Sequence, residues 1–166
     1  FINTENINNK ADKINYNGLE FVLVENGFWQ TKIQGITFNF QYNPLETKEM
    51  NLTFINSKFI NTLQAYSNKP LYFVSEIDIA EREIVSNIRN FVSRVQDACL
   101  QGVNQTCSEN LPVKNCENTS YNVIIIKEAN YSSISQDGSC VNIMSTYSES
   151  GKTADAFLYK IMGISE

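Results

Sequence analysis

Four cysteines have the clearest chemistry in this sequence of 166 residues: Cys99, Cys107, Cys116 and Cys140. Four thiols can form two disulfides in three ways. Pairing neighbours along the chain, Cys99 with Cys107 and Cys116 with Cys140, closes short loops, so we favour this pairing while the other two remain open. In the chain-entropy model each bond would add about 2.5 to 3.5 kcal/mol. A zinc site is disfavoured because there is no C-x2-C or C-x4-C pair and no histidine.

Asparagine-linked glycosylation is the second chemistry that the sequence offers. Asn51, Asn104, Asn118 and Asn130 each begin an Asn-x-Ser/Thr motif. Three of the four fall in predicted loops beside the cysteines, where a glycan would be tolerated. Paired cysteines and glycosylation motifs together predict a protein with N-linked glycans in the extracellular space or on the cell surface.

The sequence lacks the residues of the common nucleophilic enzymes. Without histidine, neither a Ser-His-Asp nor a Cys-His arrangement is possible. The stretch 150–153, Ser-Gly-Lys-Thr, matches the end of a phosphate-binding loop, but Thr146 stands where that motif requires its first glycine. A polar helix start is the better interpretation.

Acidic residues cluster at Glu76, Asp78, Glu81 and Glu83, where a pair of carboxylates could in principle hydrolyse a glycoside. Acids at this position suit the start of a helix, because they interact favourably with its dipole. Asp137-Gly138 alone does not supply the alternating oxygen ligands of a calcium loop. We therefore predict no enzymatic activity, no cofactor and no metal.

The charge balance excludes several partners. With 13 basic and 18 acidic residues the net charge is -5, and the cations are scattered, which argues against nucleic acid as a partner. No apolar run approaches the roughly 18 residues of a membrane helix, so we predict no membrane insertion. The sequence becomes polar directly after Phe1 and Ile2 and has no initiator methionine. These features predict a processed or trimmed product, although a fragment begun at an arbitrary point would look the same.

The elements that position the cysteines are predicted from turn signals and apolar periodicity. Residues 1–17 form a polar arm that could contact a neighbouring subunit, and residues 18–166 form a single domain. Strands are expected around turns at Asn26-Gly27 (type I′), Gln34-Gly35 and Asp137-Gly138. Residues 123–127 are apolar on both faces, which predicts a central strand.

A long amphipathic helix is predicted over about 78–101, with Asp78 as its N-cap, Glu81 completing a capping box and Gly102 at its end. Its apolar stripe comprises Ile84, Ile88, Phe91, Val95 and Cys99. A C-terminal helix is predicted over about 152–162. The expected fold is α+β: a mainly antiparallel sheet with the long helix on one face and the C-terminal helix alongside.

From Cys99 onward the order of features resembles uncharacterised extracytoplasmic proteins of small-genome archaea. The matching stretches cover about the last 40% of the chain: Ala98-Cys99, Cys107, Cys116-Glu117-Asn118-Thr119, 123–128, 138–143 and 157–164. The resemblance implies a membrane-tethered or surface domain with paired cysteines, and it brings no known activity and no functional residues. The N-terminal anchor usual in such proteins is missing here.

These features predict an extracellular structural protein: a glycosylated, disulfide-braced subunit of a filament, pilus-like fibre or surface layer that associates with copies of itself. The alternative is a monomeric binding or adhesion module that recognises a sugar, a peptide or a partner cell. A glycosidase that uses two carboxylates is a distant third.

Overall fold

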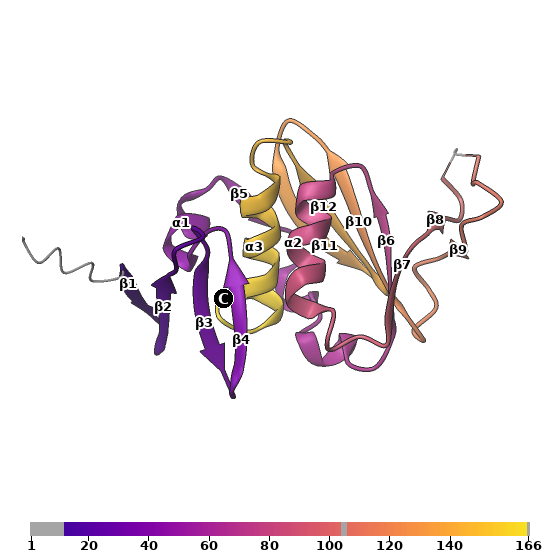
Figure 1. Cartoon of the computed structure of the whole chain (residues 1–166). Coiled ribbons are helices and arrows are strands. Elements are labelled where there is room, and N and C mark those ends of the chain that lie inside the picture. The colour runs from indigo at the N-terminus through magenta and orange to yellow at the C-terminus, as the bar shows by residue number, and fades with distance from the viewer. Residues whose placement is uncertain (1–11, 104–105, 166) are drawn as a thin grey trace, which may run out of the picture.

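Two β-sheets enclose the helices α2 and α3 in the computed structural model, which describes residues 12–103 and 106–165 (Figure 1). The strands of the first sheet, in order, are β1 (Lys13–Tyr16), β2 (Leu19–Leu23), β3 (Trp29–Ile33) and β4 (Ile36–Phe40). The strands of the second sheet, in spatial order, are β5 (Leu52–Phe54), β11 (Ser132–Asp137), β12 (Cys140–Ser145), β10 (Asn122–Glu128), β6 (Pro70–Ser75) and β7 (Arg94–Asp97).

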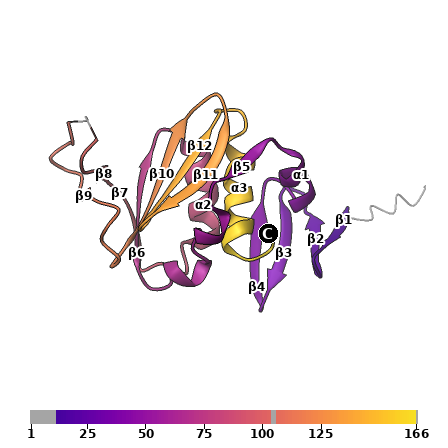
Figure 2. The same ribbon diagram turned by 180° about the vertical axis from the view of Figure 1, so that it is seen from behind.

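The remaining elements connect or flank these layers. They are α1 (Pro44–Glu49), α2 (Asp78–Ile88), α3 (Ser150–Ile161), the 3-10 turns η1 (Ser57–Phe59) and η2 (Leu63–Tyr66), and the short parallel pair β8 (Cys99–Leu100) and β9 (Val113–Lys114). The view from behind shows the same three layers, with the β8–β9 loops projecting from the far end of the second sheet (Figure 2).

Tight turns build the antiparallel first sheet. Asn17-Gly18 and the predicted Gln34-Gly35 turn both place two successive residues at positive φ, the type I′ geometry that matches strand twist. The type I′ prediction at Asn26-Gly27 is wrong, because only Gly27 has a positive φ and Val24 bonds across a longer loop to Phe28. Lys13–Tyr16, inside the predicted arm of 1–17, form β1. Residues 1–11 of that arm lie outside the described residues.

Parallel pairs dominate the second sheet. The chain leaves β6, crosses through α2 and returns as β7, parallel to β6, while β10 lies parallel to both β6 and β12. Only β11 and β12 form an antiparallel pair in this sheet. The α+β class stands in its coarse sense, with helices and both strand arrangements, but the prediction of a mainly antiparallel sheet holds for the first sheet and is wrong for the second. β10 is a central strand, as predicted.

The predicted helix over 78–101 is much shorter, since α2 ends at Ile88. Its N-cap is Ile77, without a side-chain cap bond, so the predicted cap at Asp78 is also wrong. Beyond α2, the Asn68 N–H donates to the Phe91 carbonyl at 2.8 Å, and the chain then joins β6 as β7. Val95 and Cys99, predicted to continue the apolar stripe of the helix, therefore lie in strands β7 and β8. The C-terminal helix α3, at 150–161, lies close to its predicted range.

Aromatic side chains fill the space between the first sheet and α3. The Tyr159 ring lies 4.5 Å from that of Phe40 and 5.9 Å from that of Phe21, centroid to centroid. All three are fully buried. On β10 the side chains alternate, because Ile124 and Ile126 face the helices while Val123 and Ile125 belong to a second apolar cluster on the opposite, outer face.

Candidate functional sites

The cysteines form two disulfides in the pairing that the loop lengths favoured. Cys99 pairs with Cys107 (the lobe disulfide), with their Cα atoms 5.7 Å apart, and Cys116 pairs with Cys140 (the sheet disulfide) at 5.0 Å. The sheet disulfide anchors the loop after β9 to the buried strand β12. The lobe disulfide braces the projecting loop between β8 and β9. Both bonds therefore hold segments that contribute little to the core between the layers.

Gly138 fits the loop that carries the sheet disulfide. A Cβ atom at this position would lie 2.0 Å from the carbonyl oxygen of Cys116, and the φ of Gly138 is +56°. The Ser139 N–H donates to the same carbonyl at 2.8 Å. The β11–β12 hairpin, predicted from Asp137-Gly138, thus also docks the disulfide loop. The close approach of the Cys116 carbonyl requires glycine at position 138.

Three of the predicted glycosylation sites lie on the surface. Asn51 and Asn130 are exposed and line one groove of about 810 Å³ beside β5, although 79 residues separate them along the chain. Asn118 is exposed in the loop after Cys116, where its Oδ1 accepts from the Ser120 N–H at 2.9 Å. Asn104 lies outside the described residues.

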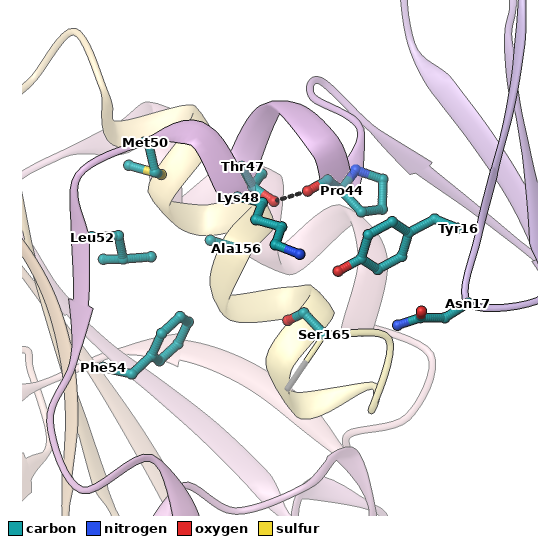
Figure 3. Close-up of a pocket in the computed structure, with 10 residues that line it drawn as sticks. All are labelled: Tyr16, Asn17, Pro44, Thr47, Lys48, Met50, Leu52, Phe54, Ala156 and Ser165. Carbon is teal, nitrogen blue, oxygen red and sulfur yellow. Dashed lines mark hydrogen bonds between the residues drawn. The ribbon is translucent and has the colours of Figure 1, made fainter.

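A cavity of about 480 Å³ opens where the first sheet, α1, β5 and α3 meet. Tyr16, Asn17 and Lys48 present polar groups to it, and Leu52 and Phe54 form an apolar wall opposite them (Figure 3). A cavity of this size with one apolar side and a few polar groups could hold a small amphipathic ligand.

Two buried carboxyl groups lie together, Glu83 of α2 and Asp155 of α3, which are 4% and 0% exposed. Burial, and then the neighbouring Glu83, raise the pKa of Asp155 well above its ordinary value of 3.8. The raised pKa favours the protonated carboxyl, which can donate to the adjacent Glu83. Oδ1 of Asp155 is the only buried side-chain polar atom in the described residues for which the structure shows no hydrogen-bond partner.

Hydrogen bonds attach this pair to the segment after β4. The Tyr42 N–H donates to Oδ2 of Asp155 at 2.8 Å, and Gln41 donates to both oxygens of Glu83 at 3.2 and 3.0 Å. The Tyr159 hydroxyl donates to the Tyr42 carbonyl, and burial raises the pKa of Tyr159. Asp155 is fully buried, and Glu83 is almost buried at the base of a surface hollow between β4 and α2, so the pair suits a structural lock between layers better than catalysis on a substrate.

The other acids considered for hydrolysis do not join this pair. Glu76 accepts from the Glu128 N–H at 3.0 Å, and Asp78 is exposed. Burial, and then Asp97, raise the pKa of Glu81. Only Glu83 meets a second buried carboxyl, and its partner Asp155 lies 72 residues later, on a helix where periodicity gave no sign of it.

The stretch 150–153 is the first turn of α3, consistent with a polar helix start. Ser150 donates to the Tyr147 carbonyl at 2.7 Å, and Thr153 bonds to Ser145 at 3.0 Å. A Cβ on Gly151 would lie 2.7 Å from the Gln41 side chain, so Gln41 occupies the space beside this glycine.

None of the helices in the described residues is long and apolar enough to cross a membrane. No group of three or more potential metal ligands occurs in 12–103 or 106–165. Comparisons with models of known families, with curated proteins and with solved structures found no match.

Proposed function

We propose that the protein is an extracellular structural protein, a glycosylated and disulfide-braced subunit of a cell-surface assembly that associates with copies of itself. The observation that carries self-association is the contrast between the two edges of the first sheet. One edge is closed by side chains of α2, whereas the other presents backbone groups that pair with no other strand among the described residues.

The closed edge is β4. The Asn39 N–H donates to the side chain of Asn87 at 3.2 Å, and that side chain donates in turn to the Asn39 carbonyl at 2.8 Å. The Gln41 N–H just beyond donates to Glu83 at 3.2 Å. Side chains thus satisfy outward backbone groups of Asn39 and Gln41, which hinders the addition of another strand at this end of β4.

The open edge is β1. The Leu23 N–H donates to the Asp12 carbonyl at 2.9 Å, and Ile14 lies opposite Phe21. Because bonded and non-bonded pairs alternate in an antiparallel ladder, Lys13 and Asn15 direct their backbone groups away from the sheet. An edge of this kind can accept a strand from a second copy.

The predicted glycans support the choice of β1 over the second sheet's edge strand β5. Asn51 directly precedes β5, and Asn130 lies beside it in the same groove. Glycans there would cover this edge and leave β1 free. The two disulfides support the extracellular setting, since such bonds persist in oxidising compartments.

The size of the native protein tests this proposal. Asn15→Pro removes an outward N–H from β1, whereas Asn15→Ala changes the side chain and keeps the backbone donor. We expect light scattering to find an assembly for the wild type and for Asn15→Ala, and a monomer for Asn15→Pro. A wild-type protein that remains monomeric at high concentration would contradict self-association.

The cavity in Figure 3 favours a second candidate, the monomeric binding module. Its polar groups at Tyr16 and Lys48 face the apolar wall at Phe54, an arrangement suited to a sugar or short peptide. Glycan and peptide array binding by a monomeric wild-type protein, lost in Phe54→Ala and kept in the distant exposed variant Phe59→Ala, would favour this function.

A further inference from the structure

A cluster of cations and tyrosines lies on the outer face of the second sheet. The Lys114 Nζ atom is 4.4 Å from the ring centre of Tyr72 and 4.8 Å from that of Tyr121. Arg94 donates a hydrogen bond to the Tyr72 hydroxyl, and its guanidinium carbon is 5.6 Å from the same ring. The two rings meet edge to face, with centroids 5.4 Å apart.

Hydrogen-bond donors exceed acceptors in this cluster. The Tyr72 hydroxyl accepts from Arg94, and the Tyr121 hydroxyl accepts from the Asn115 N–H at 3.0 Å. Neither hydroxyl donates its own proton to any group in the described residues. Arg94 and Lys114 both have the Tyr72 hydroxyl as a hydrogen-bond partner. The two hydroxyl protons and the remaining N–H groups of the two cations have no acceptor among the described residues.

The cations also lack carboxylate partners. In the part of the chain that the structure describes, the only ion pair joins Lys13 and Glu20, far from this cluster. Two uncompensated positive charges thus lie together in a protein of net charge -5. Although burial raises the pKa of Tyr72, the adjacent Arg94 and Lys114 outweigh it and lower the pKa overall. The site is therefore locally electropositive.

We propose that Arg94, Lys114 and the two tyrosine hydroxyls bind an oxyanion: a sulfate, phosphate or carboxylate group. Arginine and lysine on either side of a hydroxyl donor provide charge-assisted hydrogen bonds to such a group. Arg94 is exposed and Lys114 is partly exposed, so the anion can reach both cations from solvent, while the buried Tyr72 forms the floor. The oxyanion is either a free ion or a group carried by an acidic saccharide.

Nuclear magnetic resonance titration of the whole chain tests this site. Sodium sulfate is added at an ionic strength matched with sodium chloride, and the backbone amides near residues 72, 94, 114 and 121 are followed. We expect saturable shifts confined to these amides, and at least a tenfold loss of affinity in the double variant Arg94→Gln/Lys114→Gln. Lys58→Gln is the matched control, because Lys58 also lies over an aromatic ring, 5.1 Å from the centre of Phe59, and it should bind as the wild type does.

A second titration distinguishes the source of the anion. A sulfated oligosaccharide that binds at least tenfold more tightly than inorganic sulfate indicates a saccharide ligand, and equal or weaker binding indicates a free ion. Absence of saturable shifts with sulfate, phosphate and the oligosaccharide would overturn the proposal, as would unchanged binding by the variants. If the double variant does not fold, Lys114→Gln alone serves the same comparison.

Discussion

Replacing Asp155 with asparagine should remove the pH dependence that the carboxyl pair confers on stability. Asparagine keeps an oxygen for the Tyr42 N–H, and its amide can donate to Glu83 without a titrating proton. The wild type needs that proton, because two buried carboxylates cannot both be charged at low cost. The variant therefore retains the hydrogen bonds and loses the titration.

The sign follows from the raised pKa of Asp155. Between the unfolded pKa of about 4 and the higher folded pKa, the folded protein binds more protons than the unfolded chain, so stability falls as the pH rises. The slope is about 1.4 kcal/mol per pH unit for one proton. The loss is complete once the pH exceeds the folded pKa, and below about pH 4 the pair no longer makes stability pH-dependent.

Charged and titratable groups near the pair belong to three other positions. Glu46 of α1 and the carboxyl pair all act electrostatically on Tyr159 of α3, and Lys152 lies 5.0 Å from the ring centre of Tyr42. All three remain in the variant. The difference between wild type and variant therefore isolates the proton on the pair.

Urea denaturation at half-unit steps from pH 4 to pH 8 measures this difference. We expect the wild type to lose stability relative to Asp155→Asn with the stated slope, so that the variant is the more stable protein at neutral pH. Asp155→Ala should instead be about 3 kcal/mol less stable than Asp155→Asn across the pH range, because alanine leaves the buried partners of Asp155 unpaired. Asp78→Asn, an exposed acid of the same charge, serves as the control. Parallel curves for wild type and Asp155→Asn across this range would refute the shared proton.

The remaining predictions concern the turns, the core and the cross-links. Gly138→Ala should lower the free energy of unfolding by more than the roughly 1 kcal/mol expected of Gly18→Ala, because both positions have positive φ but only Gly138 meets the Cys116 carbonyl; equal losses in urea denaturation would contradict this contact. Tyr159→Phe should cost about 1–3 kcal/mol by the same assay, because the Tyr42 carbonyl loses its donor; an unchanged midpoint would show that water replaces the hydroxyl. Replacing both cysteines of the sheet disulfide with alanine should cost about 1 kcal/mol more than replacing both of the lobe disulfide, because it closes the longer loop; the reverse order of thermal midpoints would show that loop length is not decisive.

Local turn chemistry was the most predictable part of the fold. Residue type predicts the Gln34-Gly35 turn correctly, and it predicts the β11–β12 hairpin to within one residue, since Asp137 pairs with Cys140 and the turn lies at 138–139. The Asn17-Gly18 turn carries an equally strong signal between Tyr16 and Leu19, but the asparagine-rich segment before it favours a loose arm. An Asn-Gly turn signal between two apolar residues is a better predictor of a hairpin than the composition of the segment before it.

The length of α2 could not be predicted from periodicity. Phe91 and Val95 continue the helical spacing of Ile84 and Ile88, but spacing alone does not distinguish a longer helix from a turn and strand. The chain leaves the helix because β6 offers a parallel edge to Val95 and the ring of Phe38 stacks on that of Phe91 at 6.0 Å. Both contacts are long-range, and the parallel arrangement of the second sheet depends on them.

The candidate sites also divide into those that local sequence predicts and those that depend on long-range packing. Loop length favours the cysteine pairing that the structure has, and Asn118 and Asn130 are exposed in the loops expected for them, as is Asn51 ahead of β5. The carboxyl pair could not be predicted, because Glu83 and Asp155 each look like an ordinary polar residue on its own helix. Only the packing of α2 against α3 beneath the first sheet brings them together.

The first sheet depends on the far end of the chain for its completion. The Asn17 side chain donates to the Ile164 carbonyl at 2.9 Å, across 147 residues of sequence, and Tyr42 bonds to Asp155 across 113. A nascent chain would therefore expose the apolar face of β1–β4 until α3 emerges, and contacts so distant in sequence slow folding. The hairpins at the start of the chain can form early, but their docking must be among the last events of maturation.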